Sequence, residues 1–130
     1  MSSPAPILEA DIVVIGAGGA GLFAALTAAR TGAQVILVSA TPLAQTASYW
    51  AQGGLAAALG DDDSAELHLE DTLAAGRGAV RRSAAVQLCN EAPGIVHELE
   101  HLGVRFDADR SGVLALGLEG GHSRRRVVHA

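Results

Sequence analysis

The sequence predicts an α/β fold that opens with a βαβ unit, the start of a doubly wound parallel sheet. Two apolar runs, at residues 11–16 and 34–39, are typical of buried parallel strands, which are almost continuously apolar. Between them, residues 19–32 place small and apolar side chains at helical spacing and end on Gly32, a residue type that commonly ends helices. A strand, a helix and a second strand in this order form a right-handed crossover.

Glycine spacing after the first strand predicts a dinucleotide site. Gly16 allows a tight turn, Gly18 lets the backbone approach a pyrophosphate, and Gly21 lets the helix pack closely on the strand. The N–H groups and the dipole of the helix N-terminus favour the negative charge of phosphates. The cofactor-binding residues predicted here are Gly16, Ala17, Gly18, Gly19, Ala20 and Gly21.

The remaining elements follow from turn and capping residues. Residues 41–54 are small and polar and predict a loop at the carboxyl end of the second strand, where function often resides. Asp63 or Ser64 is the expected N-cap of a helix over 65–76. Further helices are predicted over 83–90 and 93–102, with a proline in the first turn of the latter, and a small hairpin over 104–106 and 113–116.

Composition restricts the possible partners and compartment. The 130 residues make one domain at most, with 49% apolar and 3% aromatic residues. A net charge of −5 argues against general binding of nucleic acid or a membrane surface. We find no signal peptide or apolar run long enough to span a membrane. Cys89 is the one cysteine, which excludes an internal disulfide and leads us to expect a cytoplasmic chain. The final residues lack a polar tail, so we expect a truncated chain.

The cofactor is indicated by the segment after the second strand. No acidic residue stands about 20 positions beyond the glycines, where a nicotinamide site would hold the ribose. Ser39 is therefore either a neutral ribose ligand or simply the end of a strand. Residues 46–54 offer hydroxyls, an amide, two aromatic rings and two glycines, which could lie along a flavin ring or form a structural loop around core aromatics.

Ala51-Gln52-Gly53-Gly54, preceded by Tyr49-Trp50, resembles the succinate dehydrogenase/fumarate reductase flavoprotein family, and within it the L-aspartate oxidase branch. The dehydrogenases carry a histidine bonded covalently to the flavin at the position of Ala47. Alanine cannot form that bond, so the resemblance implies non-covalently bound FAD.

Three later segments extend the resemblance. Residues 60–78 and 102–107 are similar to family motifs, and Glu119-Gly120-Gly121-His122-Ser123 with its downstream arginines and His129-Ala130 resembles the most specific motif of the oxidase branch. Leu118 and Arg124 depart from that motif.

The resemblance implies a role for each matched residue. The glycine turn would cradle the pyrophosphate, and Ser39 and Ala40 would approach the ribose. Glu119 would orient a catalytic arginine beyond residue 130; the alternative is a surface residue in a turn. The residues that would line the flavin are Ala47, Ser48, Tyr49, Trp50, Ala51, Gln52, Gly53 and Gly54.

The function so implied is FAD-dependent oxidation of L-aspartate to iminoaspartate, with O2 or fumarate as acceptor, in the first step of quinolinate and NAD biosynthesis. Quinolinate synthase is a partner that the resemblance allows. Residues 1–130 would be the N-terminal part of a Rossmann-like FAD-binding domain, without the rest of that domain, a capping domain or a C-terminal helical domain. The alternatives are a succinate dehydrogenase or fumarate reductase flavoprotein subunit, and a non-catalytic fragment.

Other motifs compete weakly. His97-Glu98-Leu99-Glu100-His101 matches a zinc-protease signature, but the two histidines fall opposite the apolar side of the expected helix and no third ligand is placed, so surface histidines are favoured and no metal is expected. The arginines at 124–126 are interpreted as ordinary charge or, by resemblance, as part of the wall near the active site. His68 and Cys89 are interpreted as packing or surface residues. His122 lies in a glycine-flanked loop and is either a substrate-side residue or an ordinary loop residue.

Overall fold

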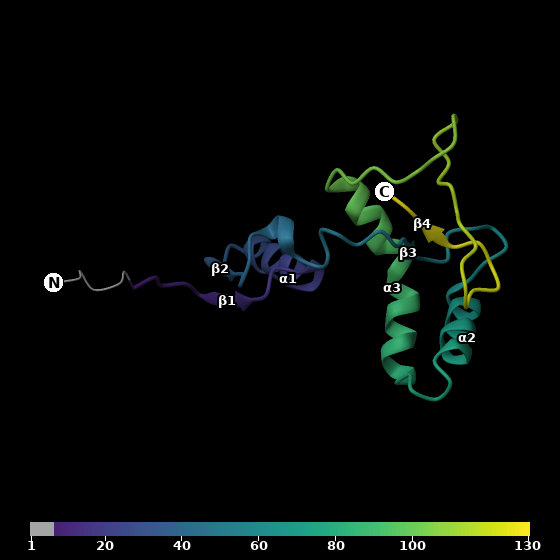
Figure 1. Cartoon of the computed structure of the whole chain (residues 1–130), viewed down its shortest axis with the longest axis horizontal. Coiled ribbons are helices and arrows are strands. Elements are labelled where there is room, and N and C mark those ends of the chain that lie inside the picture. Colours follow the sequence, from purple (N-terminus) through teal and green to yellow (C-terminus); the bar gives the residue numbers. More distant parts are fainter. Residues whose placement is uncertain (1–6) are drawn as a thin grey trace. The chain divides into compact units, whose positions relative to one another are not determined.

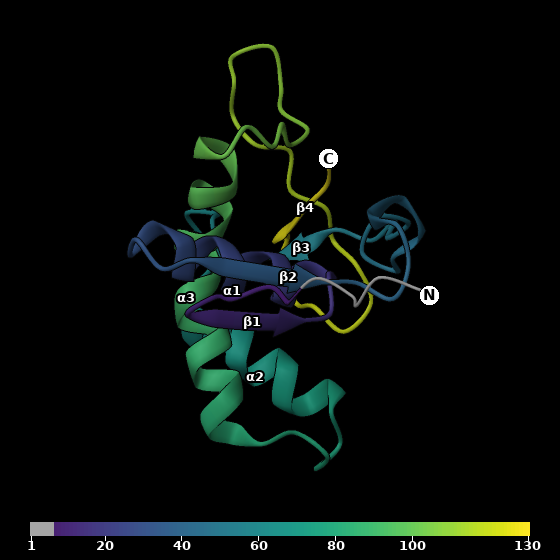
Figure 2. The same cartoon turned by 90° about the vertical axis from the view of Figure 1, so that its left-hand side faces the viewer.

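The computed structural model describes residues 7–130, which form two compact units, Met1–Gln52 and Gly53–Ala130. The first unit confirms the predicted βαβ opening. Strand β1 (Ile12–Ile15) pairs in parallel with β2 (Val35–Val38), from Ile12 opposite Val35 to Ile15 opposite Val38. Helix α1 (Gly19–Arg30) packs on both strands (Figure 2).

Helix α1 ends two residues before the predicted boundary. Thr31 is its C-cap and donates a hydrogen bond from Oγ1 to the carbonyl of Ala28 at 2.7 Å. Gly32 then adopts φ +89°, a left-handed conformation that glycine accepts without penalty. The residue expected to end the helix is therefore the one at which the chain turns away.

The two strands are not buried, contrary to the sequence prediction. The exposed fractions are 40% for Ile12, 55% for Val13 and 85% for Ile15. The described chain pairs only two strands in this sheet, so each strand has an unpaired edge. An apolar run of this kind indicates the burial that a wider sheet would provide.

The second unit is built on two helices that lie side by side, α2 (Ala65–Ala75) and α3 (Arg82–His101), joined by a short turn (Figure 1). Ser64 is the N-cap of α2, because its Oγ accepts a hydrogen bond from the N–H of Leu67 at 3.2 Å. The buried Cys89 Sγ lies 3.8 Å from Thr72 Oγ1, between the two helices. The core of the unit comprises Ala57, Ala92, Val96 and Val128.

Helix α3 replaces the two helices predicted over 83–90 and 93–102. Pro93 lies inside it rather than in a first turn. Proline removes one helical hydrogen bond and usually kinks or breaks a helix. Ala92 and Val96 are nevertheless buried in the same core, so packing on both sides of the proline holds the two halves in one helix.

Short antiparallel pairings complete the unit, and the strand pair among them was not predicted from the sequence. Strand β3 (Leu55–Ala56) pairs antiparallel with β4 (Val127–Val128). The predicted hairpin is present only as a bridge between Ala108 and Leu114, so residues 104–106 are not a strand. The turn begins at Asp109, whose Oδ1 accepts hydrogen bonds from the backbone N–H groups of Ser111 and Val113. The pairing therefore starts at Ala108 and not at the predicted residues 104–106.

A one-turn 3-10 helix, Leu43–Gln45, interrupts the predicted loop over 41–54. No helix among residues 7–130 combines the length and apolar character required to cross a bilayer.

Candidate functional site

The turn between β1 and α1 has the geometry that its glycines predict. Gly16 has φ +107° and donates its N–H to the carbonyl of Val38 at 2.8 Å, which ties the turn to the end of β2. A Cβ at position 21 would lie 1.8 Å from the carbonyl oxygen of Gly16. Helix α1 can therefore pack against the turn only if residue 21 is glycine.

Ser48 connects the loop after β2 to this turn. Its Oγ accepts a hydrogen bond from the N–H of Gly19 at 2.9 Å, and a Cβ at position 18 would lie 3.3 Å from the same oxygen. Two segments of the predicted cofactor site, 29 positions apart in sequence, thus meet at the N-terminus of α1.

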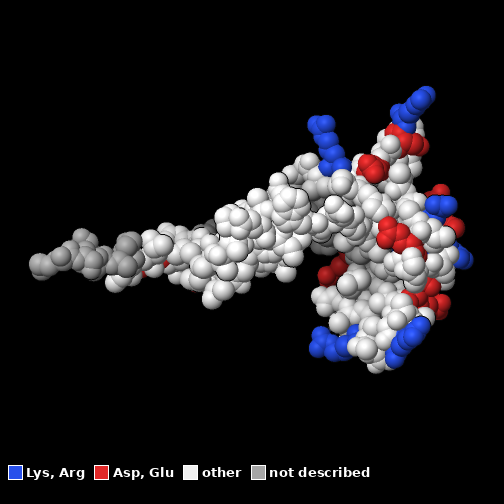
Figure 3. Space-filling view, viewed as in Figure 1, with Lys and Arg blue, Asp and Glu red and all other residues white. Residues whose placement is uncertain are grey.

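The first unit has few charged side chains, so a phosphate bound there would be held mainly by backbone N–H groups. Its charged residues are Glu9, Asp11 and Arg30, and Figure 3 shows the charged side chains gathered mainly over the second unit. Gly18, the N-cap of α1, has no side chain with which to cap the helix. The N-terminus of α1 is a candidate cradle for a pyrophosphate, because helix N-termini favour negative charge and glycine permits close approach, but the N–H of Gly19 already donates to Ser48 Oγ.

Two further predicted residues near this turn are polar or exposed. Ser39 donates from Oγ to the carbonyl of Thr41 at 2.5 Å, so its oxygen still has acceptor capacity. Tyr49 and Trp50 form an edge-to-face pair with ring centroids 5.6 Å apart and are 64% and 68% exposed. The aromatic pair is therefore not part of a core, and its rings are available to a ligand.

Gly53 and Gly54 belong to the second unit. A Cβ on Gly54 would lie 2.3 Å from Val127 Cγ1 and 3.0 Å from His129 Cδ2. Gly117 is close to the other side of the same imidazole, since its Cβ would lie 3.1 Å from His129 Cε1. Glycine at positions 54 and 117 thus makes room for β4 and for the ring of His129.

Glu119, the predicted catalytic-site residue, pairs with His129. Its Oε1 lies 2.8 Å from His129 Nε2, and the side chains are 49% and 36% exposed respectively. A carboxylate only accepts hydrogen bonds, so the imidazole donates from Nε2. His129 was not among the predicted site residues, although it stands in the same sequence motif as Glu119.

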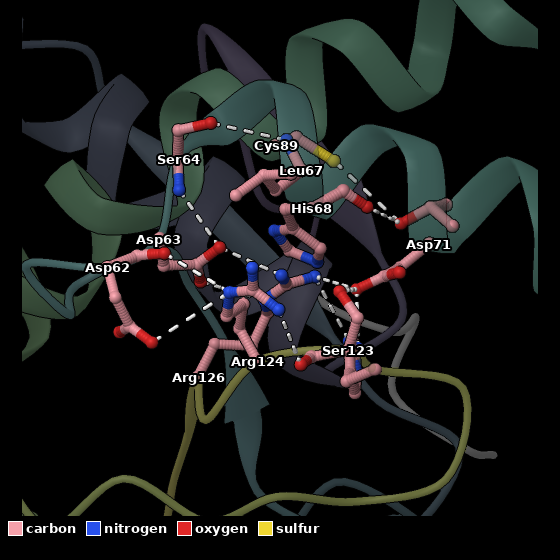
Figure 4. Close-up of polar contacts among 12 residues, drawn as sticks. Asp62, Asp63, Ser64, Leu67, His68, Asp71, Cys89, Ser123, Arg124 and Arg126 are labelled. Atoms are coloured by element: carbon pink, nitrogen blue, oxygen red, sulfur yellow. Dashed lines mark hydrogen bonds and ion pairs between the residues drawn. The ribbon is translucent and has the colours of Figure 1, made fainter.

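The same unit contains a buried ionic cluster, Asp63–Arg126–Asp71 (Figure 4). Arg126 donates from Nε and Nη2 to the two carboxylate oxygens of Asp63, both at 2.8 Å, and from Nη1 to Asp71 Oδ2 at 2.8 Å. The side chains of Arg126 and Asp63 are fully buried. The interpretation of the three arginines as ordinary charge is therefore wrong for Arg126, although it holds for the half-exposed Arg124.

The pKa values of Asp71, in this cluster, and of the buried His68 are shifted. Burial acts to raise the pKa of Asp71, but hydrogen bonds from Ser123 and the charge of Arg126 outweigh it and hold that pKa below its usual range. Burial lowers the pKa of His68, and the positive charge of Arg126 lowers it further. Nδ1 of His68 is buried without a hydrogen-bond partner among the described residues, and its ring stands edge-on to that of His122, with centroids 5.7 Å apart.

The zinc-like motif is occupied by contacts within α3. His101 Nδ1 hydrogen-bonds to the carbonyl of His97 at 2.7 Å, and His97 Nδ1 lies 3.2 Å from Glu100 Oε2. Within residues 7–130, no group of three or more His, Cys, Asp or Glu is arranged to hold a metal ion.

Comparison with known proteins agrees with this geometry. Residues 11–130 match the model of the FAD binding domain family. The chain is 46% identical over 132 residues to the L-aspartate oxidase of Streptomyces coelicolor, covering 100% of this chain and 23% of that protein. It is 50% identical over 119 residues to the L-aspartate oxidase of Agrobacterium fabrum, covering 91% of this chain and 22% of that protein.

Solved structures share the fold. Mycobacterium smegmatis Sdh1 in complex with UQ1 matches with a TM-score of 0.88 and 36% identity, over 93% of this chain and 21% of that one. The E. coli quinol fumarate reductase subunit FrdA matches with a TM-score of 0.87 and 31% identity, over 92% and 21%. The chain thus spans about a quarter of the length of the relatives it matches. It belongs to the FAD binding domain family, as an L-aspartate oxidase-like member of the succinate dehydrogenase/fumarate reductase flavoproteins.

Proposed function

We propose that this chain supplies the FAD-binding segment of an enzyme that oxidises L-aspartate to iminoaspartate, with O2 or fumarate as electron acceptor. The observation that carries the proposal is the 46% identity to an L-aspartate oxidase over the whole chain. The glycine turn at the start of α1 supports it, because Gly16 in its left-handed conformation makes the tight turn that a dinucleotide site requires. Such a step would feed quinolinate and NAD biosynthesis. We further propose that residues 1–130 are the N-terminal part of the FAD-binding domain.

The residues have separate tasks in holding FAD. Backbone N–H groups of residues 16–21 bind the pyrophosphate, and Ser39 with Ala40 lies at the ribose. Residues 47–54 lie along the flavin, and Ala47 offers no side-chain nucleophile, so the cofactor is held non-covalently. Bound FAD supplies the redox chemistry by accepting hydride from the α-carbon of aspartate.

Glu119 is the residue that the family resemblance implies for catalysis, and His129 is its hydrogen-bond partner. His129 hydrogen-bonds to one oxygen of Glu119, and no hydrogen bond to the other oxygen is present among residues 7–130. That oxygen can orient an arginine through its planar donor fork, as the family resemblance implies for an arginine beyond residue 130. Glu119 thus holds a proton-carrying group in place rather than transferring the proton itself.

A chimera tests the substrate assignment. Residues 1–130 replace the matching segment of the Streptomyces coelicolor L-aspartate oxidase, and oxygen consumption is measured with L-aspartate and with D-aspartate as control. We expect a yellow protein that consumes oxygen with L-aspartate only. A chimera that binds flavin but is not reduced by L-aspartate would refute the assignment.

The alternative function is that of a dehydrogenase or fumarate reductase flavoprotein subunit, and the likeness to the two solved structures favours it. Ala47 argues against it, because the dehydrogenases have a histidine bonded to the flavin at that position. Succinate-dependent dye reduction by the chimera, without activity on L-aspartate, would support this alternative.

The isolated chain is expected to bind FAD weakly and to lack turnover, since most of the substrate ligands implied by the resemblance lie outside it. Titration of FAD fluorescence against residues 1–130 measures the affinity directly. Oxidase activity of the chain alone would contradict this expectation.

A further inference from the structure

The segment between Gly117 and Val127 is a closed loop. Gly117 donates its N–H to the carbonyl of Val127 at 2.8 Å, and Arg126 donates its N–H to the carbonyl of Gly117 at 3.1 Å. At the far end, Glu119 to His122 forms a turn closed by a 3.2 Å hydrogen bond, with Gly121 at φ +87°. Glu119 therefore lies on a loop, whereas its partner His129 lies just outside the loop, after β4.

The alignment of Glu119 with His129 depends on where that loop is held. Both side chains are partly exposed, so packing around them provides little restraint. The ring of His129 is confined by Gly54 and Gly117, at which any Cβ would come within about 3.1 Å of the imidazole. On the side of Glu119, the restraint must come from the loop itself.

The loop is anchored at two neighbouring points to α2 and to the turn before it. Arg126 reaches Asp63 and Asp71 through three hydrogen bonds of 2.8 Å. Asp71 Oδ2 also accepts from the N–H and Oγ of Ser123, at 2.7 and 2.8 Å. Figure 4 shows these groups converging on the guanidinium of Arg126. A fully buried, bidentate ion pair is costly to rearrange, because either charge alone would be left without a partner.

We propose that Arg126, gripped by Asp63 and Asp71, is a positioning residue that sets the loop so that Glu119 meets His129 beside Gly54. The catalytic meaning of the pair rests on the proposed function, since Gly54 belongs to the segment proposed to line the flavin. The mechanical claim concerns only residues of this chain. The ionic cluster acts on Glu119 only through the loop that carries it.

Side-chain NMR of the imidazoles in the 130-residue chain tests the claim. In the unaltered chain, His129 is expected to show one tautomer with the proton on Nε2 and a cross-peak to the side chain of Glu119. Arg126→Lys keeps the charge but loses the planar fork, and Asp71→Asn keeps the shape but weakens both the Ser123 and Arg126 contacts. In each variant we expect loss of the cross-peak and averaging of the two tautomers, with unchanged far-UV circular dichroism.

Arg124→Lys is the matched control, because Arg124 is a neighbouring arginine on the same loop whose ion pair with Asp62 is exposed and 3.8 Å long. It is expected to leave the spectrum of His129 unchanged. If Arg126→Lys fails to fold, Asp71→Asn decides the question. A folded Asp71→Asn variant with an intact His129–Glu119 cross-peak would overturn the proposal. Neither result depends on flavin or aspartate, so failure of the proposed function would be seen separately in the chimera.

Discussion

Gly21 lies where the first unit has no room for a side chain. Replacing it with alanine places Cβ 1.8 Å from the carbonyl of Gly16. Backbone on both sides must then move, and we expect Gly21→Ala to lower the free energy of unfolding of this unit by about 3 kcal/mol. Chemical denaturation with FAD titration measures both the loss of stability and the loss of cofactor binding.

Gly19→Ala is the matched control for stability. Its Cβ would lie 3.8 Å from Ser48 Oγ, an ordinary contact, and alanine favours a helix over glycine by up to about 1 kcal/mol. Equal destabilisation by the two substitutions would contradict the interpretation of Gly21 as a close-approach glycine.

His68 predicts a specific pH dependence of stability. Its pKa in the folded chain is below the unfolded value of 6.5, so the fold favours the neutral imidazole. The stabilisation is complete above about pH 6.5 and declines as the pH falls below that value, because the unfolded chain takes up the proton first. Denaturation between about pH 7 and 5 should show this decline, and His68→Phe should remove it.

Asp71 provides the internal comparison for that experiment. Its folded pKa is below its ordinary value, so its contribution to stability is present above about pH 4 and is lost as the pH falls further. The loss below about pH 4 should therefore persist in the His68→Phe chain. A variant that still loses stability near pH 6 would show that another group is responsible.

Sequence reasoning located residues whose role is local and missed those whose role depends on distant partners. Gly16, Gly21 and Ser64 were identified because turns and caps involve a few adjacent residues. The burial of Arg126 requires two carboxylates 63 and 55 positions earlier in the chain. The three consecutive arginines do not indicate which of them will pair with those carboxylates.

At the scale of the elements, α3 shows packing overriding a local signal. Pro93 disfavours a continuous helix, yet the buried Ala92 and Val96 flank it in one core. The opposite failure affects β3 and β4, which are two residues each and carry no detectable periodicity. Their pairing of Leu55 with Val128 is a long-range contact, which only the complete unit specifies.

Pro93 should therefore limit the stability of α3. Pro93→Ala restores a backbone donor inside the helix and removes the steric clash, so we expect it to raise the free energy of unfolding by as much as about 3 kcal/mol. The neighbouring Gly94→Ala, where a Cβ meets nothing within 4 Å, should gain only up to about 1 kcal/mol. Urea denaturation of both variants compares them, and a neutral or destabilising Pro93→Ala would show that the packing of α3 depends on the proline.

For the whole molecule, apolar burial is divided unequally between the two units. All four residues of the hydrophobic core lie in Gly53–Ala130, whereas Ala17 is the one buried residue among positions 7–52. Sequence patterns predicted the parallel opening correctly but not this imbalance, because an apolar run looks the same whether or not other elements cover it.

Separate expression of the two units tests this division. Gly53–Ala130 alone should unfold in one cooperative transition, because it retains the core and the Arg126 cluster. Met1–Gln52 alone should unfold at a lower urea concentration, since so short a segment with an exposed sheet buries little apolar surface. Circular dichroism during urea titration measures both; a first unit as stable as the second, or an unfolded second unit, would contradict the division.

The position of Cys89 provides the chain with its own reporter of opening. The thiol is 1% exposed and sits between α2 and α3, and no other cysteine exists to confuse its signal. A thiol reagent such as DTNB can react only when the two helices separate. The rate of colour formation under native conditions therefore measures how often α2 and α3 separate by local unfolding, without any label or substitution.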